Sequence, residues 1–189
     1  MQKIMLLAVC LCCLSYSHAQ FSPGTPVHGS LQAGAGYVYD FPGMTGVAGF
    51  ARYNVAVNDW LQAGAGLKRI EASGHPRTGS VTEFTKATTI DVALLAVPFA
   101  TDHAALRIGL GYTFSFYHTR RTYPDYGHNN QEAVVNWPVV DSRGIAHGTT
   151  LEAEYDYYFS DIFSAGFRVS VCKAYDGIIM AGPFAGIRF

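Results

Sequence analysis

The last 41 residues of the sequence, 149–189, alternate apolar and polar side chains with a period of two. Between 148 and 159 the two sets are Leu151, Ala153, Tyr155, Tyr157 and Phe159 on one face, and Glu152, Glu154 and Asp156 on the other. Segments 162–174 and 178–189 repeat the pattern. This alternation puts one face of each strand in an apolar medium and the other in a polar interior, which is typical of a transmembrane β-barrel. A soluble sandwich would bury its apolar faces in a shared core instead.

The same period predicts an all-β fold, a closed antiparallel transmembrane barrel of eight strands. The expected strands are 29–39, 46–54, 60–71, 87–99, 105–118, 148–159, 162–174 and 178–189. A six-residue repeat, at 31–36 and again at 61–66, gives the first and third strands equivalent positions. Its glycines fall in mid-strand rather than before a helix, so we expect them to make room for large interior side chains and not to bind phosphate.

The first 19 residues have the pattern of a secretory signal peptide. Lys3 precedes an apolar run over 4–14, and Ser17 and Ala19 have the small side chains of a cleavage site. The run is too short to cross a bilayer as a helix. We therefore expect removal of residues 1–19, a short N-terminal periplasmic segment at 20–28 and a barrel over 29–189.

The composition of the predicted mature chain narrows its class. It has 170 residues, with 12 basic and 14 acidic side chains, and this balance gives no reason to expect nucleic-acid binding. Cys172 is its one cysteine, so an intramolecular disulfide is excluded. No other stretch is long and apolar enough for a spanning helix, which leaves strands as the means of membrane insertion.

The connections alternate between short and long. Those at 55–59, 101–104 and 160–161 are short, whereas those at 72–86 and 119–147 are long. Bacterial outer-membrane barrels have short periplasmic turns and longer outer loops, so we expect both barrel termini in the periplasm. The long outer loops carry residue types that are common in binding surfaces. The interaction candidates are Arg120, Arg121, Tyr123, Tyr126, His128 and Trp137.

Three features together resemble the small outer-membrane β-barrel proteins of Gram-negative bacteria, the porin-family or OmpA/OmpX-like barrels. They are the signal peptide, the run 96–99 before a short turn and the glycine-rich strand 108–112, and the closing segment 184–189 with its terminal Phe189. The resemblance implies an outer-membrane location, contact with membrane lipid and lipopolysaccharide, and recognition of Phe189 by the barrel assembly machinery. Pro183 departs from the pattern, and a bulge or a locally open seam is expected there.

Charged residues on the inner face are expected to pair within the lumen, because charge on the lipid face is costly. The predicted structural network is Arg52, Lys68, Arg107, Glu152, Glu154, Asp156 and Arg168. Since an eight-stranded interior is just wide enough for side chains to fill, we expect no conducting pore.

The leading functional hypothesis is a monomeric, non-enzymatic structural or surface-interaction protein without catalytic, cofactor or metal residues. The alternatives are a small porin or solute conduit, a lipopolysaccharide-modifying acyl hydrolase or acyltransferase, and a soluble lipocalin-like barrel. An acyl hydrolase would need a serine and a histidine on one face, yet Ser115 and His118 fall on opposite faces. His118, His128 and His147 lack a short fixed spacing that would favour a metal site.

Overall fold

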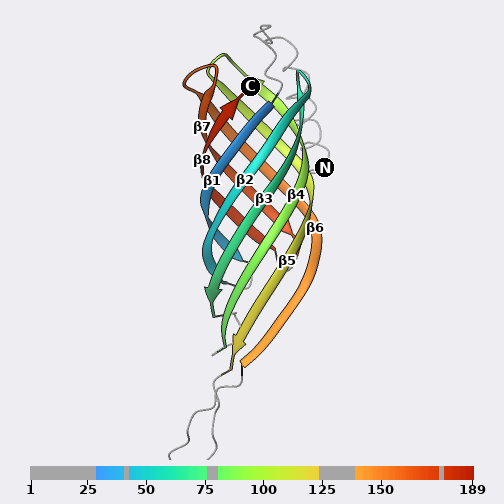
Figure 1. The fold of residues 1–189 in the computed structure, drawn as a ribbon, viewed down its shortest axis with the longest axis vertical. Helices are drawn as coiled ribbons and strands as arrows, with labels where there is room; N and C mark the ends of the chain where they lie inside the picture. Colours follow the sequence, from blue (N-terminus) through green and yellow to red (C-terminus); the bar gives the residue numbers. More distant parts are fainter. Residues whose placement is uncertain (1–28, 41–42, 76–80, 124–138, 175–176) are drawn as a thin grey trace, which may run out of the picture.

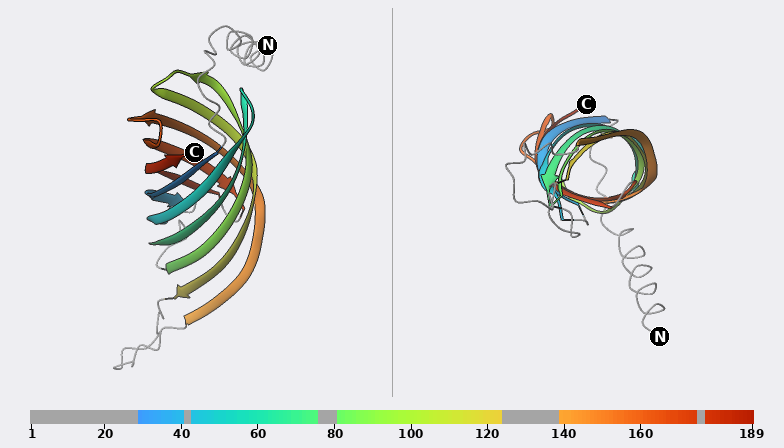
Figure 2. Two further views of the ribbon diagram at one scale, coloured as in Figure 1. Left: turned by 45° about the horizontal axis from the view of Figure 1, so that its top comes forward. Right: turned by 90° about the horizontal axis from the view of Figure 1, so that it is seen from below.

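The computed structural model describes residues 29–40, 43–75, 81–123, 139–174 and 177–189, which form eight antiparallel strands closed into one barrel (Figures 1 and 2). Each strand pairs with its neighbours in the chain, and β8 pairs with β1. The strands are β1 (Gly29–Asp40), β2 (Thr45–Asn58), β3 (Leu61–Gly74), β4 (Thr82–Ala100), β5 (Ala104–Thr122), β6 (Val139–Tyr158), β7 (Phe163–Lys173) and β8 (Ile178–Arg188). The predicted all-β fold class and its eight strands are confirmed.

The register of the pairs fixes the tilt of the barrel. A path that follows paired residues once around the barrel from Gly29 returns to β1 at Tyr39, ten residues further along the strand. Such a stagger tilts the strands by roughly 40° and leaves an interior that side chains can fill.

The first and last described residues lie at the same end of the barrel, which we call the terminal end. There the Phe189 carbonyl accepts a hydrogen bond from the Gly29 amide at 2.9 Å, and the Phe189 amide donates to the Gly29 carbonyl at 3.0 Å. The short β2–β3, β4–β5 and β6–β7 connections lie at this end as well. We call the opposite end the far end.

The outer and inner faces differ in polarity in the way that a bilayer requires. Leu110 and Leu151 on the outer face are 64% and 55% exposed, whereas Glu152 and Glu154 on the inner face are almost fully buried. A soluble lipocalin-like barrel has the reverse arrangement, so this geometry excludes that alternative.

Strands β4, β5 and β6 extend well beyond the predicted bounds. β4 begins at Thr82 rather than at 87, β5 ends at Thr122 rather than at 118, and β6 begins at Val139 rather than at 148. In the added residues the outer face carries charged and apolar side chains together, among them Arg120, Arg143 and Ile145. The two-sided alternation therefore stops, although the backbone ladder continues.

The prolines have different effects on the ladder. Pro98 lies inside a register shift between Ala96 and Phe99 of β4, where the absence of an amide proton is tolerated. At Pro183 the structure has no bulge, but it has the alternative predicted feature, a locally open seam between β1 and β8. β7–β8 pairing runs through Pro183, and β1–β8 pairing keeps one register on both sides of a local gap between Gly34 and Tyr37.

Candidate functional site

The seven predicted interior residues all point into the lumen and lie in one ion network with Asp91. Glu154 is its centre: its carboxylate accepts a hydrogen bond from Arg168 Nε at 2.8 Å. Arg52 Nη1 and Arg107 Nη1 lie 3.4 Å and 3.7 Å from the same carboxylate. The network contains four carboxylates and four cations, and so it is neutral. Its members are Asp91, Glu152, Glu154, Asp156, Arg52, Lys68, Arg107 and Arg168.

The remaining contacts of the network run around the barrel wall. Arg107 donates to Asp156 at 3.0 Å and to the Tyr158 hydroxyl at 3.0 Å. Lys68 Nζ lies 3.4 Å from Asp91, and Arg52 pairs with Glu152. Strands β2, β3, β4, β5, β6 and β7 each contribute a charged side chain. The network therefore joins strands that are far apart in the sequence.

Polar side chains that the sequence analysis did not single out complete the network. Gln32 accepts from Arg168 at 2.6 Å, and Asn54 accepts from Arg52 at 2.8 Å. Asp91 faces Arg52 and Lys68. The period-two rule that found the other charges applies to all three, since each occupies an inward position of a predicted strand.

The repeat glycines make the room that the large side chains need. A Cβ atom at Gly64 would collide with the Arg52 guanidinium, and one at Gly34 would collide with the Phe50 ring. The two copies of the repeat therefore accommodate different partners, one charged and one aromatic.

A layer of buried apolar side chains occupies the lumen on the far-end side of the ion network. On β2, Ala48 lies nearer the far end than Arg52, and on β3, Ile70 lies nearer than Lys68. The Arg168 guanidinium lies between the layer's two phenylalanine rings, 4.6 Å and 5.6 Å from their centroids. The buried members are Val38, Ala48, Phe50, Ile70, Ala87, Met180 and Phe184.

Toward the far end, β5 and β6 continue past the last β6–β7 pair, and we call residues 113–122 and 139–148 the far-end hairpin (Figure 1). β4 pairs with the β5 half of this hairpin as far as Thr82 with Thr122. Pairing runs from Thr113 with Gly148 to Thr122 with Val139. β7 pairs with β6 only from Thr149 onward. Within the described residues, the β7-facing edge of 139–148 thus has no partner strand.

The six interaction candidates were all expected in the loop 119–147, and the structure places two of them in a strand. Arg120 and Arg121 lie within β5 and not in a loop, because the ladder continues to Thr122. Arg121 turns inward, and its Nε donates to Glu83 at 2.8 Å, whereas Arg120 is exposed on the outer face. Tyr123 is exposed just after β5. The other three candidates, Tyr126, His128 and Trp137, lie outside the described residues.

Basic side chains collect on the outer face where the apolar band ends. Lys86 pairs with Glu71 at 3.4 Å, and His118 lies 3.5 Å from Asp141. Glu71, Lys86, His118 and Arg143 are consecutive cross-strand partners. We call the lysine, arginine and histidine members of this surface the basic belt: Arg69, Lys86, His118, Arg120 and Arg143.

The serine and histidine side chains do not form a nucleophile and base. The Ser115 hydroxyl shares a hydrogen bond with Thr89 at 3.1 Å inside the lumen, while His118 lies on the outer face. His147 Nδ1 pairs with the Tyr112 hydroxyl at 2.6 Å. In the part of the chain that the structure describes, no three His, Cys, Asp or Glu side chains gather as metal ligands.

Known structures share this architecture at low sequence identity. The protein is similar to the outer membrane protein OprG from Pseudomonas aeruginosa, with a TM-score of 0.59 and 8% identity over 88% of this chain and 98% of that one. It is also similar to Ail, the attachment invasion locus protein of Yersinia pestis, with a TM-score of 0.54 and 12% identity over 85% and 97%. Ail in complex with the heparin analogue sucrose octasulfate gives a TM-score of 0.52, with 11% identity over 85% and 97%.

No protein-family model matches the sequence, and no curated protein matches it. The features that identify the fold are therefore the eight strands, the apolar outer face, the charged lumen and the similarity to these solved structures. The chain has the fold of the small eight-stranded outer-membrane β-barrels of Gram-negative bacteria, as its sequence resemblance implies.

Proposed function

We propose that this protein is a monomeric outer-membrane barrel that anchors the far-end hairpin at the cell surface and binds other molecules through it. The observation that carries the proposal is the hairpin's length. Ten residue pairs of β5 and β6 continue past the last β6–β7 pair. A strand extension of this size is unnecessary for crossing a bilayer, which takes about 9–11 residues of each strand.

The chemistry of the hairpin suits binding at its edge and its outer face. An unpaired strand edge presents amide and carbonyl groups to which an extended segment of a partner can add. Val140 and Ile145 are 48% and 67% exposed, and they supply apolar contacts along this strand. Tyr123 adds an exposed aromatic ring at the hairpin's end.

The basic belt supplies a second kind of contact, with the anionic groups of lipopolysaccharide in the outer leaflet. Four cations and His118 face outward against two acids of the same region, Glu71 and Asp141. Arginine and lysine bind phosphate through charge-assisted hydrogen bonds. Ail, a similar structure, has been crystallised with a sulfated sugar, so sulfated saccharides belong among the probes.

The enzyme and conduit alternatives have less support. Ser115 and His118, the pair that an acyl hydrolase would need on one face, lie on opposite faces of β5. The ion network and the apolar layer occupy the lumen in succession, which disfavours a small porin. The proposed role is non-enzymatic, with assembly initiated at the C-terminal strand.

The proposed orientation has the termini in the periplasm, and cysteine labelling tests it. Ser142→Cys lies on the far-end hairpin, and Asp102→Cys lies in a short turn at the terminal end. In a Cys172→Ser background, an impermeant maleimide should label the first variant on intact cells and the second only after the outer membrane is permeabilised. The opposite pattern would reverse the orientation and rule out surface display.

Shortening the hairpin tests the binding role. Thr119 and Ser142 are cross-strand partners, so residues 120–141 can be replaced by a two-residue Asn-Gly turn. The variant should still show heat-modifiable migration, because the rest of the ladder is intact. It should lose binding to lipopolysaccharide and to an immobilised sulfated polysaccharide. Undiminished binding by the shortened barrel would refute the proposed role.

A charge-reversal variant separates the belt from the hairpin edge. Arg120→Glu with Arg143→Glu should abolish the salt-sensitive part of the binding, because these cations face outward and are not part of the interior network. Arg168→Glu is unsuitable as a control because it would disrupt the lumen. Thr122→Ser with Thr149→Ser, on the same outer faces, should leave binding unchanged.

A further inference from the structure

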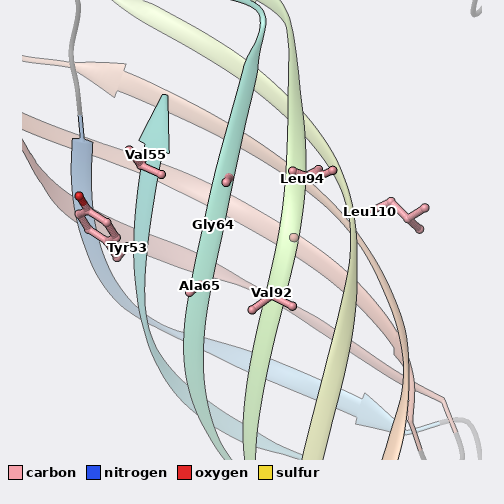
Figure 3. Close-up of a pocket in the computed structure, with 9 residues that line it drawn as sticks. Tyr53, Val55, Gly64, Ala65, Val92, Leu94 and Leu110 are labelled. Carbon is pink, nitrogen blue, oxygen red and sulfur yellow. The ribbon is translucent and has the colours of Figure 1, made fainter. Parts of the chain in front are cut away.

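The outer face of the barrel has an apolar hollow near its terminal end (Figure 3). Its volume is about 460 Å³, within the roughly 300–1,000 Å³ of small-molecule sites. Ala63 and Ala65 of β3 form its floor, because their short side chains leave the backbone uncovered. The hollow lies outside the lumen and shares no charged residue with the ion network.

Larger side chains on the neighbouring strands form the walls. Tyr53 and Val55 stand on β2, and Val92 and Leu94 stand on β4. Ala65 is the direct cross-strand partner of both Tyr53 and Val92. A floor of alanines between two rows of larger residues makes a groove along β3.

The other copy of the sequence repeat shows why this groove is specific to β3. Ala33 and Ala35 of β1 occupy the same repeat positions and also face outward. Ala33, however, pairs with Ala51 on one side and Ala185 on the other. With alanine on all three strands, Ala33 lacks the large flanking side chains that stand on both sides of Ala63 and Ala65.

The hollow lies at the depth of the membrane leaflet on the terminal side. The Tyr53 ring stacks on Phe189 at 6.2 Å between centroids, which places this wall at the aromatic girdle of the terminal end. From there the hollow extends obliquely toward Leu110, on the outer face of β5. It therefore opens into the hydrocarbon of the leaflet on the terminal side.

We propose that this hollow binds one acyl chain of a phospholipid from the leaflet at the terminal end. The hollow is continuous with the surface that meets hydrocarbon, and its lining is almost wholly apolar. The Tyr53 hydroxyl lies at the girdle, beside Gly29, where it can meet the polar part of the same lipid. The acyl chain fills the groove, and the side chains that line the groove gain packing contacts that they would otherwise lack.

Native mass spectrometry of the full chain tests the proposal. The protein is reconstituted in vesicles of phosphatidylethanolamine and phosphatidylglycerol, extracted in a mild detergent and weighed. Wild type should retain one phospholipid per barrel. Ala63→Phe with Ala65→Phe fills the groove and should reduce retention about tenfold, which corresponds to about 1.4 kcal/mol of binding free energy. The matched control, Ala33→Phe with Ala35→Phe, should retain the lipid as wild type does.

A second variant covers the case in which the filled groove prevents folding. Leu94→Ala with Leu110→Ala removes one wall without touching β3, and it should also lower retention while heat-modifiable migration shows a folded barrel. Three results would overturn the proposal: no retained phospholipid on wild type, equal retention by all variants, or a dimer that the Ala63 and Ala65 substitutions dissociate. The last result would identify a second copy of the chain as the occupant.

Discussion

A side chain on the outer face meets either the hydrocarbon of the bilayer or the membrane–water interface, depending on its depth in the bilayer. Leu151 lies on the outer face in mid-strand, whereas Ile162 is exposed in the β6–β7 turn. Leu151→Arg should lower the free energy of unfolding by about 2–4 kcal/mol, and Ile162→Arg by about 0–1 kcal/mol, because the cost of arginine depends on depth. Urea titrations of the refolded protein in lipid vesicles measure both values. Equal costs would mean that β6 is placed wrongly in the bilayer.

The centre of the ion network is a second residue-scale test. Glu154→Gln keeps the shape of the side chain but leaves four buried cations facing three carboxylates. We expect a loss of about 3–5 kcal/mol of unfolding free energy, as for a broken buried pair. The same vesicle titrations measure it.

The control for Glu154→Gln is a double variant that restores the charge balance. Glu154→Gln combined with Arg168→Met should recover part of the lost stability, because the cation removed is the one 2.8 Å from the substituted carboxylate. A double variant that is destabilised by the full sum of the two single changes would show that the charges are not coupled.

At the scale of the elements, two sets of buried side chains occupy the lumen in succession, the ion network and the apolar layer around Phe50 and Phe184. We therefore expect no stable stepwise conductance from purified protein in planar bilayers. Glu154→Gln should be equally silent, since the apolar layer remains. A large porin recorded in the same bilayers is the positive control, and reproducible channels altered by Glu154→Gln would favour the conduit alternative.

At the scale of the whole molecule, barrel closure joins the first and last strands. Phe189 pairs with Gly29 through two backbone hydrogen bonds and stacks on Tyr53. Phe189→Ser should reduce severalfold the heat-modifiable fraction recovered from outer membranes, because both the ring contact and the proposed assembly signal are lost. Phe159→Ser is the control, since this phenylalanine is similarly exposed at the same end, 68% against 64%. Equal losses would assign the effect to the aromatic girdle alone.

Within the membrane-spanning part, the sequence alone determined the fold class, the strand order and the faces. Apolar and polar media lie on opposite sides of each strand, so Leu151 and Glu152 could be assigned outward and inward from their neighbours. The same alternation placed seven charged residues in the lumen. It would also have found Asp91, had every inward position been counted.

Only the tertiary structure decided what depends on neighbours distant in sequence. Residues 119–122 and 139–147 of the far-end hairpin were assigned to a loop, because beyond the bilayer no second medium imposes alternation on residues such as Arg120 and Arg121. The repeat gives the clearest case. Ala33 and Ala63 have the same local sequence, yet Ala33 pairs with two alanines, whereas Ala63 lies in a groove between Val55 and Leu94. The difference arises from the side chains on adjacent strands, which pairing register alone brings together.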